Sequence, residues 1–226
     1  MHDAEPTLLL TRSEAQSKAF LNMCEARAGR RIPVIISPLL RIEPLGDVPD
    51  LNRFAAVVAT SANGVERLGV ALAGRRVRTV GERTAEIARA FGAEALALGE
   101  NVEAFLRRGG ELTGPVLVVR GVHAIGDLSE QLAGQGHDVE EAVLYDQVAV
   151  PLNGAARSLL TGGSPVVAPL FSPRTARLLA QTTVAAPLLA LAISEATAEA
   201  WIGGGRVQVA ESPDAEAMCR LVIAAF

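Results

Sequence analysis

The stretch FAAVVATSANGVERL, from Phe54 to Leu68, passes from an apolar run through a serine into a helical pattern. The stretch VVAPLFSPRTARLL, from Val166 to Leu179, does the same further along the chain. Runs rich in valine and leucine, without polar alternation, are typical of strands that are buried on both faces of a parallel sheet. Each stretch therefore predicts a strand, a corner at the serine and a helix.

The same alternation of strand and helix continues along most of the chain. Strands are predicted at 7–12, 32–40 and 139–150, and the short apolar runs VRTVG, EALAL, VLVVRG, LLALAIS and VQVAE each mark a further strand. Helical patterns follow most of these runs, and the last one, SPDAEAMCRLVIAAF, closes the chain. The sequence therefore predicts an α/β protein with parallel sheets covered by helices.

The two halves of the chain contain similar segments. VGERTAEIA (80–88) resembles ISEATAEAW (193–201), and GENVEAF (99–105) resembles SPDAEAM (212–218) at the same spacing. A repeat of about 110 residues in an α/β chain predicts two flavodoxin-like units. The long connections between these units are expected near 32–45 and 139–152.

The composition excludes several kinds of chemistry. Lys18 is the only lysine among 21 basic residues, and its context SKAF fits neither a P-loop nor a Schiff-base site. No G-x-G-x-x-G follows a strand, so a dinucleotide site is not predicted. The formal net charge is -4, the basic residues are scattered and only 4% of residues are aromatic. These features argue against a nucleic-acid partner.

Histidines and cysteines form no metal-binding pattern. His2, His123 and His137 are far from one another in the sequence, and no H-x-H or H-E-x-x-H occurs. Cys24 and Cys219 are widely separated and are read as small buried hydrophobic residues rather than as a disulfide or a metal site. No metal and no organic cofactor are therefore expected.

No targeting or membrane segment is recognised. The apolar runs are shorter than the roughly 20 residues that span a bilayer. The N-terminus MHDAEPTLLLTR carries acids where a signal peptide carries bases. The protein is therefore expected in the cytoplasm, without a membrane partner.

The corners between strand and helix are candidate anion sites. A helix N-terminus leaves backbone N–H groups unpaired and carries a partial positive charge, and a small polar residue such as Ser61 or Ser172 suits the N-cap position. Gly81 and Ser194 occupy the next pair of corners. The alternative is that each residue only caps its own helix. Ligands of doubly wound folds bind at the carboxyl ends of strands, which favours the binding interpretation.

Taken together, eight segments in this order resemble uroporphyrinogen-III synthase, and the resemblance covers almost the whole chain. The segments are LLLTR, IPVIISPLLRIEPL, VVATSANGVERL, VRTVGERTAEIARAFG, VLVVRG, VLYDQVAVP, LFSPRTARLL and VAESPDAEAM.

The resemblance implies two flavodoxin-like parallel-sheet domains joined by a two-stranded linker. Residues 1–38 and 150–226 would form one discontinuous domain and 42–145 the other, with linkers near 38–42 and 145–150. The implied reaction cyclises the linear tetrapyrrole hydroxymethylbilane to uroporphyrinogen III, with inversion of ring D and loss of water, in the biosynthesis of tetrapyrroles such as haem. A monomer that receives its substrate from hydroxymethylbilane synthase is implied, with no metal or cofactor.

The resemblance also implies the site. Tyr145, the only tyrosine, lies where the family has a tyrosine in its second linker strand, and it could donate a proton to the leaving hydroxyl. The alternative is an aromatic residue that only packs on its strand. With one lysine in the chain, arginines and backbone amides must hold the polycarboxylate substrate. The predicted substrate contacts are Arg12, Thr60, Ser61, Ala62, Asn63, Gly81, Arg83, Arg120, Gly121, Ser172, Arg174, Ser194 and Thr197.

Some positions depart from the family pattern. Ser13 replaces a proline, and Ser194 with Ala196 replaces a glycine and an arginine or threonine. Ile125 replaces a frequent arginine, which puts one substrate contact in doubt. Two alternatives stay open: a two-domain tetrapyrrole-binding or sensor protein without turnover, and a member of the family with weak activity.

Overall fold

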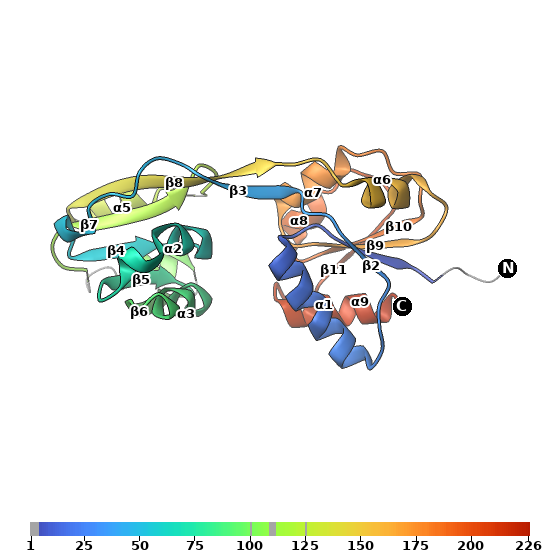
Figure 1. Cartoon of the computed structure of the whole chain (residues 1–226), viewed down its shortest axis with the longest axis horizontal. Coiled ribbons are helices and arrows are strands. Elements are labelled where there is room, and N and C mark those ends of the chain that lie inside the picture. The colour runs from blue at the N-terminus through green and yellow to red at the C-terminus, as the bar shows by residue number, and fades with distance from the viewer. Residues whose placement is uncertain (1–4, 100, 109–111, 125) are drawn as a thin grey trace. The chain divides into compact units, whose positions relative to one another are not determined.

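A computed structural model describes residues 5–99, 101–108, 112–124 and 126–226 of the chain. The chain folds into two compact units. Unit 1 contains the segment up to Arg41 and the segment from Ala149 to Phe226, and unit 2 contains Ile42–Val148 (Figure 1). The chain therefore leaves unit 1, builds unit 2 and returns to complete unit 1. Ile125 lies outside the described residues.

Unit 1 is built on a five-stranded parallel sheet with the order β11-β10-β9-β1-β2. The strands are β1 (Thr7–Leu10), β2 (Val34–Ile36), β9 (Val166–Leu170), β10 (Leu188–Ala192) and β11 (Arg206–Val209). Numbered along the chain, this is the flavodoxin order 2-1-3-4-5. The direction in which successive strands are added reverses between β1 and β9.

Unit 2 is built on a six-stranded sheet with the order β3-β8-β7-β4-β5-β6. The strands are β3 (Leu40–Pro44), β4 (Ala56–Ala59), β5 (Arg76–Val80), β6 (Glu94–Gly99), β7 (Val116–Gly121) and β8 (Val139–Ala149). β4 to β8 are parallel. β3 runs antiparallel to β8, since Leu45 N–H bonds to Leu144 C=O while Val150 N–H bonds to Leu39 C=O.

The two sheets share one spatial arrangement with different chain entry points. If β4, β5, β6, β7 and β8 are matched with β9, β10, β11, β1 and β2, the strand orders coincide. This match explains the internal repeat in the sequence, because the similar segments follow β5 and β10 and then β6 and β11. The predicted α/β fold with two parallel sheets is confirmed.

Helices cover the sheets of both units. Unit 1 has α1 (Glu14–Ala28), α6 (Gly154–Thr161), α7 (Pro173–Ala180), α8 (Glu195–Glu199) and α9 (Ala215–Ala224). Unit 2 has α2 (Ala62–Leu68), α3 (Glu82–Ala90), α4 (Val102–Arg107), α5 (Leu128–Gly134) and the 3₁₀ turns η1 (Leu51–Arg53) and η2 (Gly69–Leu72). The corner serines start helices as predicted: Ser61 caps α2, Ser172 caps α7 and Ser194 caps α8.

Each sheet is packed on both faces. In unit 2, one core cluster joins Leu117 and Leu144 of the sheet to Val65 of α2, and the other joins Val118 to Phe105 of α4 and Leu132 of α5. Unit 1 likewise has one cluster around α6 and α7 and another around α1 and α9. The described residues of each cluster belong to a single unit, so each unit has its own hydrophobic core.

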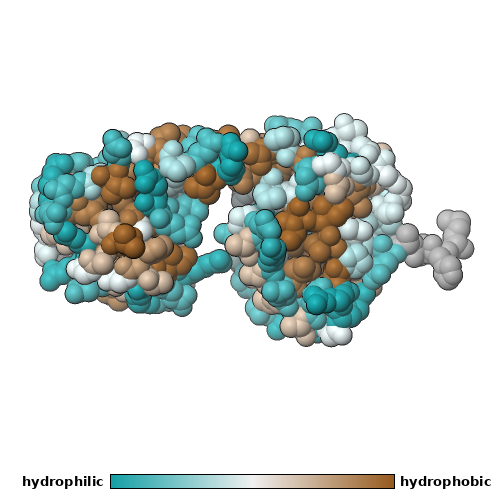
Figure 2. All heavy atoms as spheres, in the orientation of Figure 1, coloured by the Kyte–Doolittle hydropathy of each residue, from teal (hydrophilic) through white to brown (hydrophobic). Residues whose placement is uncertain are grey.

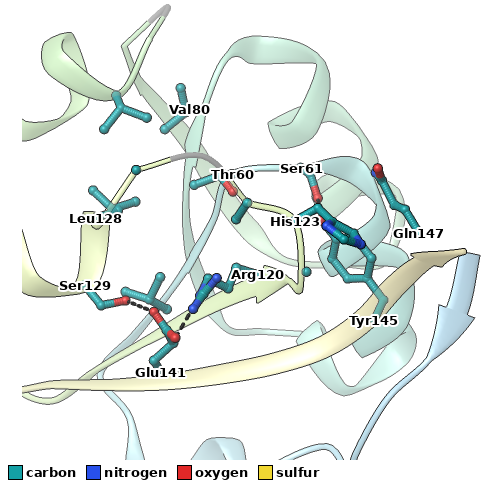
Figure 3. A pocket seen from close by; sticks show the side chains of 15 residues that line it. Thr60, Ser61, Val80, Arg120, His123, Leu128, Ser129, Glu141, Tyr145 and Gln147 are labelled. Carbon is teal, nitrogen blue, oxygen red and sulfur yellow. Dashed lines mark hydrogen bonds and ion pairs between the residues drawn. The ribbon is translucent and has the colours of Figure 1, made fainter. Parts of the chain in front are cut away.

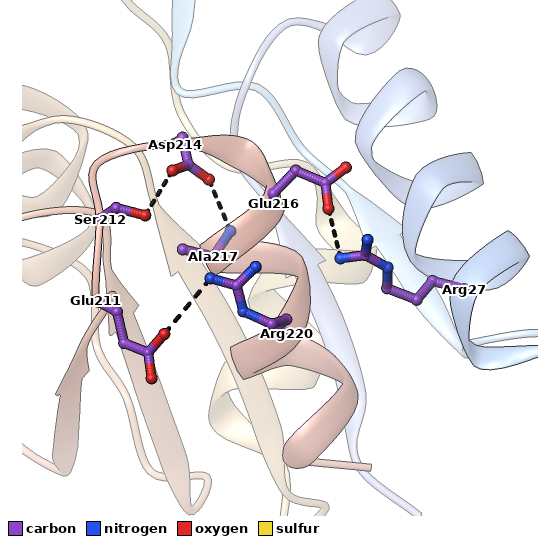
Figure 4. Close-up of polar contacts among 7 residues, drawn as sticks. All are labelled: Arg27, Glu211, Ser212, Asp214, Glu216, Ala217 and Arg220. Atoms are coloured by element: carbon purple, nitrogen blue, oxygen red, sulfur yellow. Dashed lines mark hydrogen bonds and ion pairs between the residues drawn. The ribbon is translucent and has the colours of Figure 1, made fainter.

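The contact between α1 and α9 shows how the two chain segments of unit 1 meet. Cys24 of α1 and Cys219 of α9 are free thiols with no exposed surface, and they pack in the same cluster. At the rim of this contact Arg27 forms an ion pair with Glu216, and Asp214 accepts a hydrogen bond from the N–H of Ala217 (2.8 Å) (Figure 4). The start of α9 is therefore capped where it packs on α1.

Two features differ from the sequence prediction. The single strand expected over 32–40 is split, because β2 ends at Ile36 and β3 begins at Leu40 in the other sheet. Pro38 has no N–H to donate to a ladder, which favours a break there. Helix α6 follows the capping residue Asn153 and was not predicted from sequence, although Ala156 and Leu160 lie four residues apart on its buried face.

The surface mixes hydrophilic and hydrophobic residues. On the face shown in Figure 2, hydrophobic residues occur among hydrophilic ones on both units. Val70 and Ile202 are the most exposed large hydrophobic residues, at 82% each. Exposed apolar residues of this kind are ordinary in globular proteins. Among the described residues, no helix is both long and apolar enough to cross a bilayer.

Candidate functional site

The main pocket of unit 2 lies at the carboxyl ends of its strands. From β4 the chain adds β5 and β6 on one side, and it adds β7 and β8 on the other. The order of strand addition therefore reverses between β4 and β7, and doubly wound folds bind ligands at the carboxyl ends of the strands at such a switch point. A cavity of about 340 Å³ lies there.

The lining of this cavity comes from the ends of several strands and from the segment after β7 (Figure 3). The volume is within the usual range for a small-molecule site and can hold part of a large ligand. The lining residues are Thr60, Ser61, Val80, Val102, Val118, Arg120, Gly121, His123, Ala124, Gly126, Leu128, Ser129, Glu141, Tyr145 and Gln147.

Strand periodicity explains which side chains of β7 and β8 reach the cavity. Val118 and Arg120 lie two residues apart on β7, and Glu141 of β8 pairs with Val118 in the ladder. Successive side chains of a strand point to opposite faces, so these residues share the face that α4 and α5 cover. Leu117 and Leu144 point the other way, into the core beneath α2.

A break in this ladder redirects Tyr145. Arg120 pairs with Val143, whereas Gly121 pairs with Tyr145, so Leu144 is an extra residue of β8 without a partner in β7. Such a bulge changes the direction of the following side chain. The ring of Tyr145 consequently lies against Gly121, where a Cβ would be only 2.6 Å from Cζ, and a Cβ on Gly64 of α2 would lie 3.8 Å from Cε1.

The hydroxyl group of Tyr145 meets the cap of α2. Tyr145 Oη lies 2.7 Å from Ser61 Oγ, and Ser61 Oγ also accepts the N–H of Gly64 (3.4 Å). Tyr145 is only 5% exposed, so its ring is held by packing while its hydroxyl lies beside the cavity. A buried phenol with a hydrogen-bond partner is well placed to act as a proton donor.

Arg120 lines the same cavity and is paired. Its Nε is 2.7 Å from Oε1 of Glu141, and the hydroxyl of Ser129 donates to Oε2 of Glu141 (2.6 Å) (Figure 3). Burial raises the pKa of Glu141, but the hydrogen bond from Ser129 and the neighbouring guanidinium of Arg120 outweigh burial and hold that pKa below its usual value. An anionic ligand that binds Arg120 must therefore compete with Glu141.

A second polar pair flanks Tyr145. His123 Nε2 lies 3.1 Å from Oδ1 of Asp146, and both side chains are partly exposed. A single histidine after a strand carries no motif, so the sequence favours a solvated loop residue at His123 over a ligand contact. The structure places it on the cavity wall.

The switch point of unit 1 presents the matching corners. Arg12 follows β1 as Arg120 ends β7, and its guanidinium stacks on the ring of Phe171, 4.3 Å from the centroid. Ser172, which follows Phe171 in the chain, caps α7 by accepting a hydrogen bond from the N–H of Thr175 (3.2 Å). Ser194 caps α8 in the same way through Thr197 (3.4 Å).

The structure brings together some of the predicted site residues. Thr60, Ser61, Arg120, Gly121 and Tyr145 all line the cavity of unit 2. The other predicted residues of this unit, Ala62, Asn63, Gly81 and Arg83, lie in the first turns of α2 and α3 and outside the lining. Arg12, Ser172, Arg174, Ser194 and Thr197 belong to the corners of unit 1. Substrate contact at any of these residues stays a prediction.

Three polar residues of the cavity were missed from sequence. These are Ser129, Glu141 and Gln147. Glu141 lies between Val139 and Val143 on one face of β8, and an acid on an otherwise apolar face was a usable signal for this residue. Ser129 comes from α5, and only the fold brings it to Glu141. Among the described residues, no group of three or more histidine, cysteine, aspartate or glutamate side chains is arranged to hold a metal ion.

Comparison with solved structures gives the same architecture. The chain superposes on a uroporphyrinogen-III synthetase from Helicobacter pylori with a TM-score of 0.69 and 18% identity, covering 98% of this chain and 100% of that one. It superposes on a mutant uroporphyrinogen III synthase from Thermus thermophilus with a TM-score of 0.54 and 17% identity, covering 97% and 98%. At these identities the likeness shows the fold.

The family of the chain follows from its amino-acid sequence. No curated protein sequence matches the chain significantly. The profile of the family described as uroporphyrinogen-III synthase HemD matches residues 25–220, which is most of the chain. The chain therefore belongs to the uroporphyrinogen-III synthase family, the cyclising hydro-lyases of tetrapyrrole biosynthesis.

Proposed function

We propose that this chain converts hydroxymethylbilane to uroporphyrinogen III and that the cavity of unit 2 holds the reacting end of the substrate. The observation that carries the proposal is Tyr145: a buried phenol, fixed by packing and hydrogen-bonded, at the switch point of a chain of this family. A protein that only binds tetrapyrroles would have no need for a positioned proton donor beside its pocket. The sensor alternative is therefore not favoured.

The reaction requires little from the protein beyond orientation and one proton. Tyr145 gives its proton to the hydroxyl of the hydroxymethyl group, the C–O bond breaks, and water leaves with the bonding electrons. The adjacent pyrrole nitrogen donates electrons to the carbon left behind. Holding the two terminal rings together then favours closure on the substituted carbon of ring D, through a spiro intermediate, over direct closure.

The carboxylates of the substrate need cationic and N–H partners. In unit 2 Arg120 and the capped start of α2 are the proposed partners, with Thr60 beside them. In unit 1 the proposed partners are Arg12, Arg174 and the corners at Ser172 and Ser194. Arginine suits this task because its planar group binds carboxylates in a bidentate manner.

The cellular setting is also part of the proposal. We place the enzyme in the cytoplasm as a monomer that takes hydroxymethylbilane from the synthase that makes it. Hydroxymethylbilane closes without help to the non-inverted isomer, so a short transfer would favour the inverted product. No nucleic acid or membrane is assigned a part.

The test is a coupled assay that supplies hydroxymethylbilane and separates the III and I isomers after oxidation. The wild-type chain should yield mainly isomer III, and Tyr145→Phe should lower kcat by ~10-fold or more with KM almost unchanged, because the hydroxyl acts only as the bond breaks. Exhaustive chelation should leave the rate unchanged. Isomer I alone from the wild-type chain would refute the proposed function.

A further inference from the structure

Ser61 differs from the other corner serines in what its hydroxyl group contacts. Ser172 Oγ lies 2.9 Å from Thr175 Oγ1 and Ser194 Oγ lies 3.1 Å from Thr197 Oγ1, so each contacts a threonine in the first turn of its own helix. Ser61 Oγ instead lies 2.7 Å from Oη of Tyr145, 84 residues away in the chain. The same capping residue therefore has an added role in unit 2.

The contact depends on three features that together fix the phenol. The bulge at Leu144 redirects Tyr145, the missing side chain of Gly121 leaves room for the ring, and Gly64 lets α2 approach the ring edge. A Cβ on Gly64 would lie 3.1 Å from Cγ1 of Val119 as well, so this approach is close on two sides. Oη is thus placed at Ser61 by the backbone of three elements.

The hydrogen atoms decide what Ser61 can do. A serine hydroxyl has one hydrogen to donate and two lone pairs, and one lone pair of Ser61 Oγ faces the N–H of Gly64. If Tyr145 donated its hydrogen to Ser61, that hydrogen would not be available to the substrate. If Ser61 donates to Oη, the hydrogen of Tyr145 is free to point into the cavity.

We propose that Ser61 is a positioning residue that donates its hydroxyl hydrogen to Oη of Tyr145, so that Tyr145 can protonate the leaving hydroxyl. This proposal rests on the function proposed above. When the phenol O–H bond breaks, negative charge develops on Oη, and a hydrogen bond donated by Ser61 stabilises it. The charge is transient, because the pyrrole ring that closes loses a proton as it regains aromaticity, and this proton restores the phenol.

The geometry also separates Ser61 from the substrate contacts predicted at the corners. A residue that binds a carboxylate in both the ground state and the transition state affects KM. A residue that acts through Tyr145 affects kcat, because its hydrogen bond strengthens only as charge develops on Oη. The two roles therefore predict different kinetic effects of the same substitution.

The experiment is a double-mutant cycle with Ser61→Ala and Tyr145→Phe, assayed with hydroxymethylbilane. We expect Ser61→Ala to lower kcat by about three- to tenfold, with KM changed less than twofold, and to cause almost no further loss when Tyr145 is already phenylalanine. Ser61→Thr, which keeps the hydroxyl and the cap, should restore most of kcat. Equal losses from Ser61→Ala in both backgrounds would overturn the proposal.

Ser13→Ala is the matched control for the loss of a cap. Ser13 caps α1 by accepting the N–H of Gln16 (3.4 Å), and it is exposed and remote in the chain from Tyr145. Its replacement should lower the thermal midpoint about as much as Ser61→Ala does while leaving kcat unchanged. Loss of kcat in both variants alike would attribute the effect to stability and overturn the proposal.

A spectroscopic measurement gives a readout besides activity. Tyr145 is the only tyrosine, so the Raman doublet of the tyrosine ring, whose intensity ratio reports whether the phenol oxygen accepts or donates, has one source. The ratio should indicate an acceptor in the wild-type chain and should change in Ser61→Ala but not in Ser13→Ala. A ratio that shows Oη acting only as a donor, with no hydrogen bond accepted, would overturn the proposal. An active wild type with an equally active Tyr145→Phe would overturn it too, while the proposed function would stand.

Discussion

Gly121 illustrates how one residue shapes the site. It lies at the end of β7, and the ring of Tyr145 fills the space that a side chain would need. The sequence predicts Gly121 as a substrate contact, which stays a prediction, and the geometry adds a role that does not depend on substrate. The absence of a side chain at Gly121 leaves space for the ring of Tyr145.

We therefore expect Gly121→Ala to displace Tyr145. The added methyl group would come within 2.6 Å of Cζ, which should cost about 1–3 kcal/mol of stability and lower kcat at least as much as Tyr145→Phe. Gly134→Ala is the control, because nothing lies within 4 Å of the Cβ position there. Kinetics and thermal unfolding measure the two effects, and a fully active Gly121→Ala would contradict this account.

Glu141 is the residue that limits the use of Arg120. Replacing it with glutamine keeps an acceptor for Ser129 but removes the charge that pairs with Arg120. A substrate carboxylate would then bind Arg120 without competition, and KM should fall about two- to fivefold, equivalent to roughly 0.5–1 kcal/mol.

Glu140→Gln is the matched control for this prediction. Glu140 is the neighbouring residue on β8, and it pairs with Arg53 on the surface at 2.8 Å. Its replacement should leave KM unchanged, as measured by initial rates with hydroxymethylbilane. If KM rises in Glu141→Gln, Glu141 orients Arg120 rather than competing for it.

The start of helix α9 gives a pH-dependent prediction. The pKa of Asp214 is lowered by hydrogen bonds from Ser212 and from the N–H of Ala217 at the helix start (Figure 4). A lowered pKa in the folded state adds stability that is present above the unfolded value, about 3.9, and is lost as the pH falls through the folded value.

Asp214→Asn should remove this dependence, because asparagine still caps a helix but does not titrate in this range. The thermal midpoint of the wild type should exceed that of Asp214→Asn at neutral pH. The difference should shrink as the pH falls below about 4 and disappear below the lowered folded pKa of Asp214. Thermal unfolding at several pH values measures this, and a difference that grows towards acid would have the wrong sign.

The elements themselves could largely be read from the sequence. Apolar runs such as AAVVATS and VLVVRG became β4 and β7, because a strand buried on both faces needs hydrophobic residues at every position. The division of 32–40 between two sheets could not be read, since local pattern does not say which sheet a strand joins. Helix α6 was overlooked although Ala156 and Leu160 lie four residues apart on its buried face. The repeat indicates that the two sheets share one strand order, but it does not say what that order is.

The site could be read in part. The strand ends at Ser61 and Arg120 were predicted from the strand-helix corners, and Tyr145 from the resemblance to the family. The bond between Ser61 and Tyr145 could not be predicted, because it depends on an extra residue in β8 that leaves no mark in the pattern of VLYDQV. The pairing of Glu141 with Ser129 is likewise a product of packing between β8 and α5.

The internal repeat and the separate cores indicate that one unit of the chain is inserted into the other. The chain of unit 2 is continuous, whereas unit 1 is made of two segments, yet both sheets have the same arrangement of strands. Unit 2 is thus inserted after the second strand of unit 1. An inserted domain with its own core can in principle fold alone.

We expect a fragment of residues 40–149 to fold by itself. It keeps β3 and β8 whole together with both core clusters of unit 2, and its length of about 110 residues is typical of independent domains. It should give helical and strand signals in circular dichroism and a cooperative thermal transition. It should also keep the Raman signature of Tyr145, because Ser61, Gly64 and Gly121 are all present. A fragment of residues 40–138 is the control: without β8 it lacks Ala142 and Leu144 of the core and should not fold. A 40–149 fragment that shows no cooperative transition would mean that unit 2 depends on unit 1 for its stability.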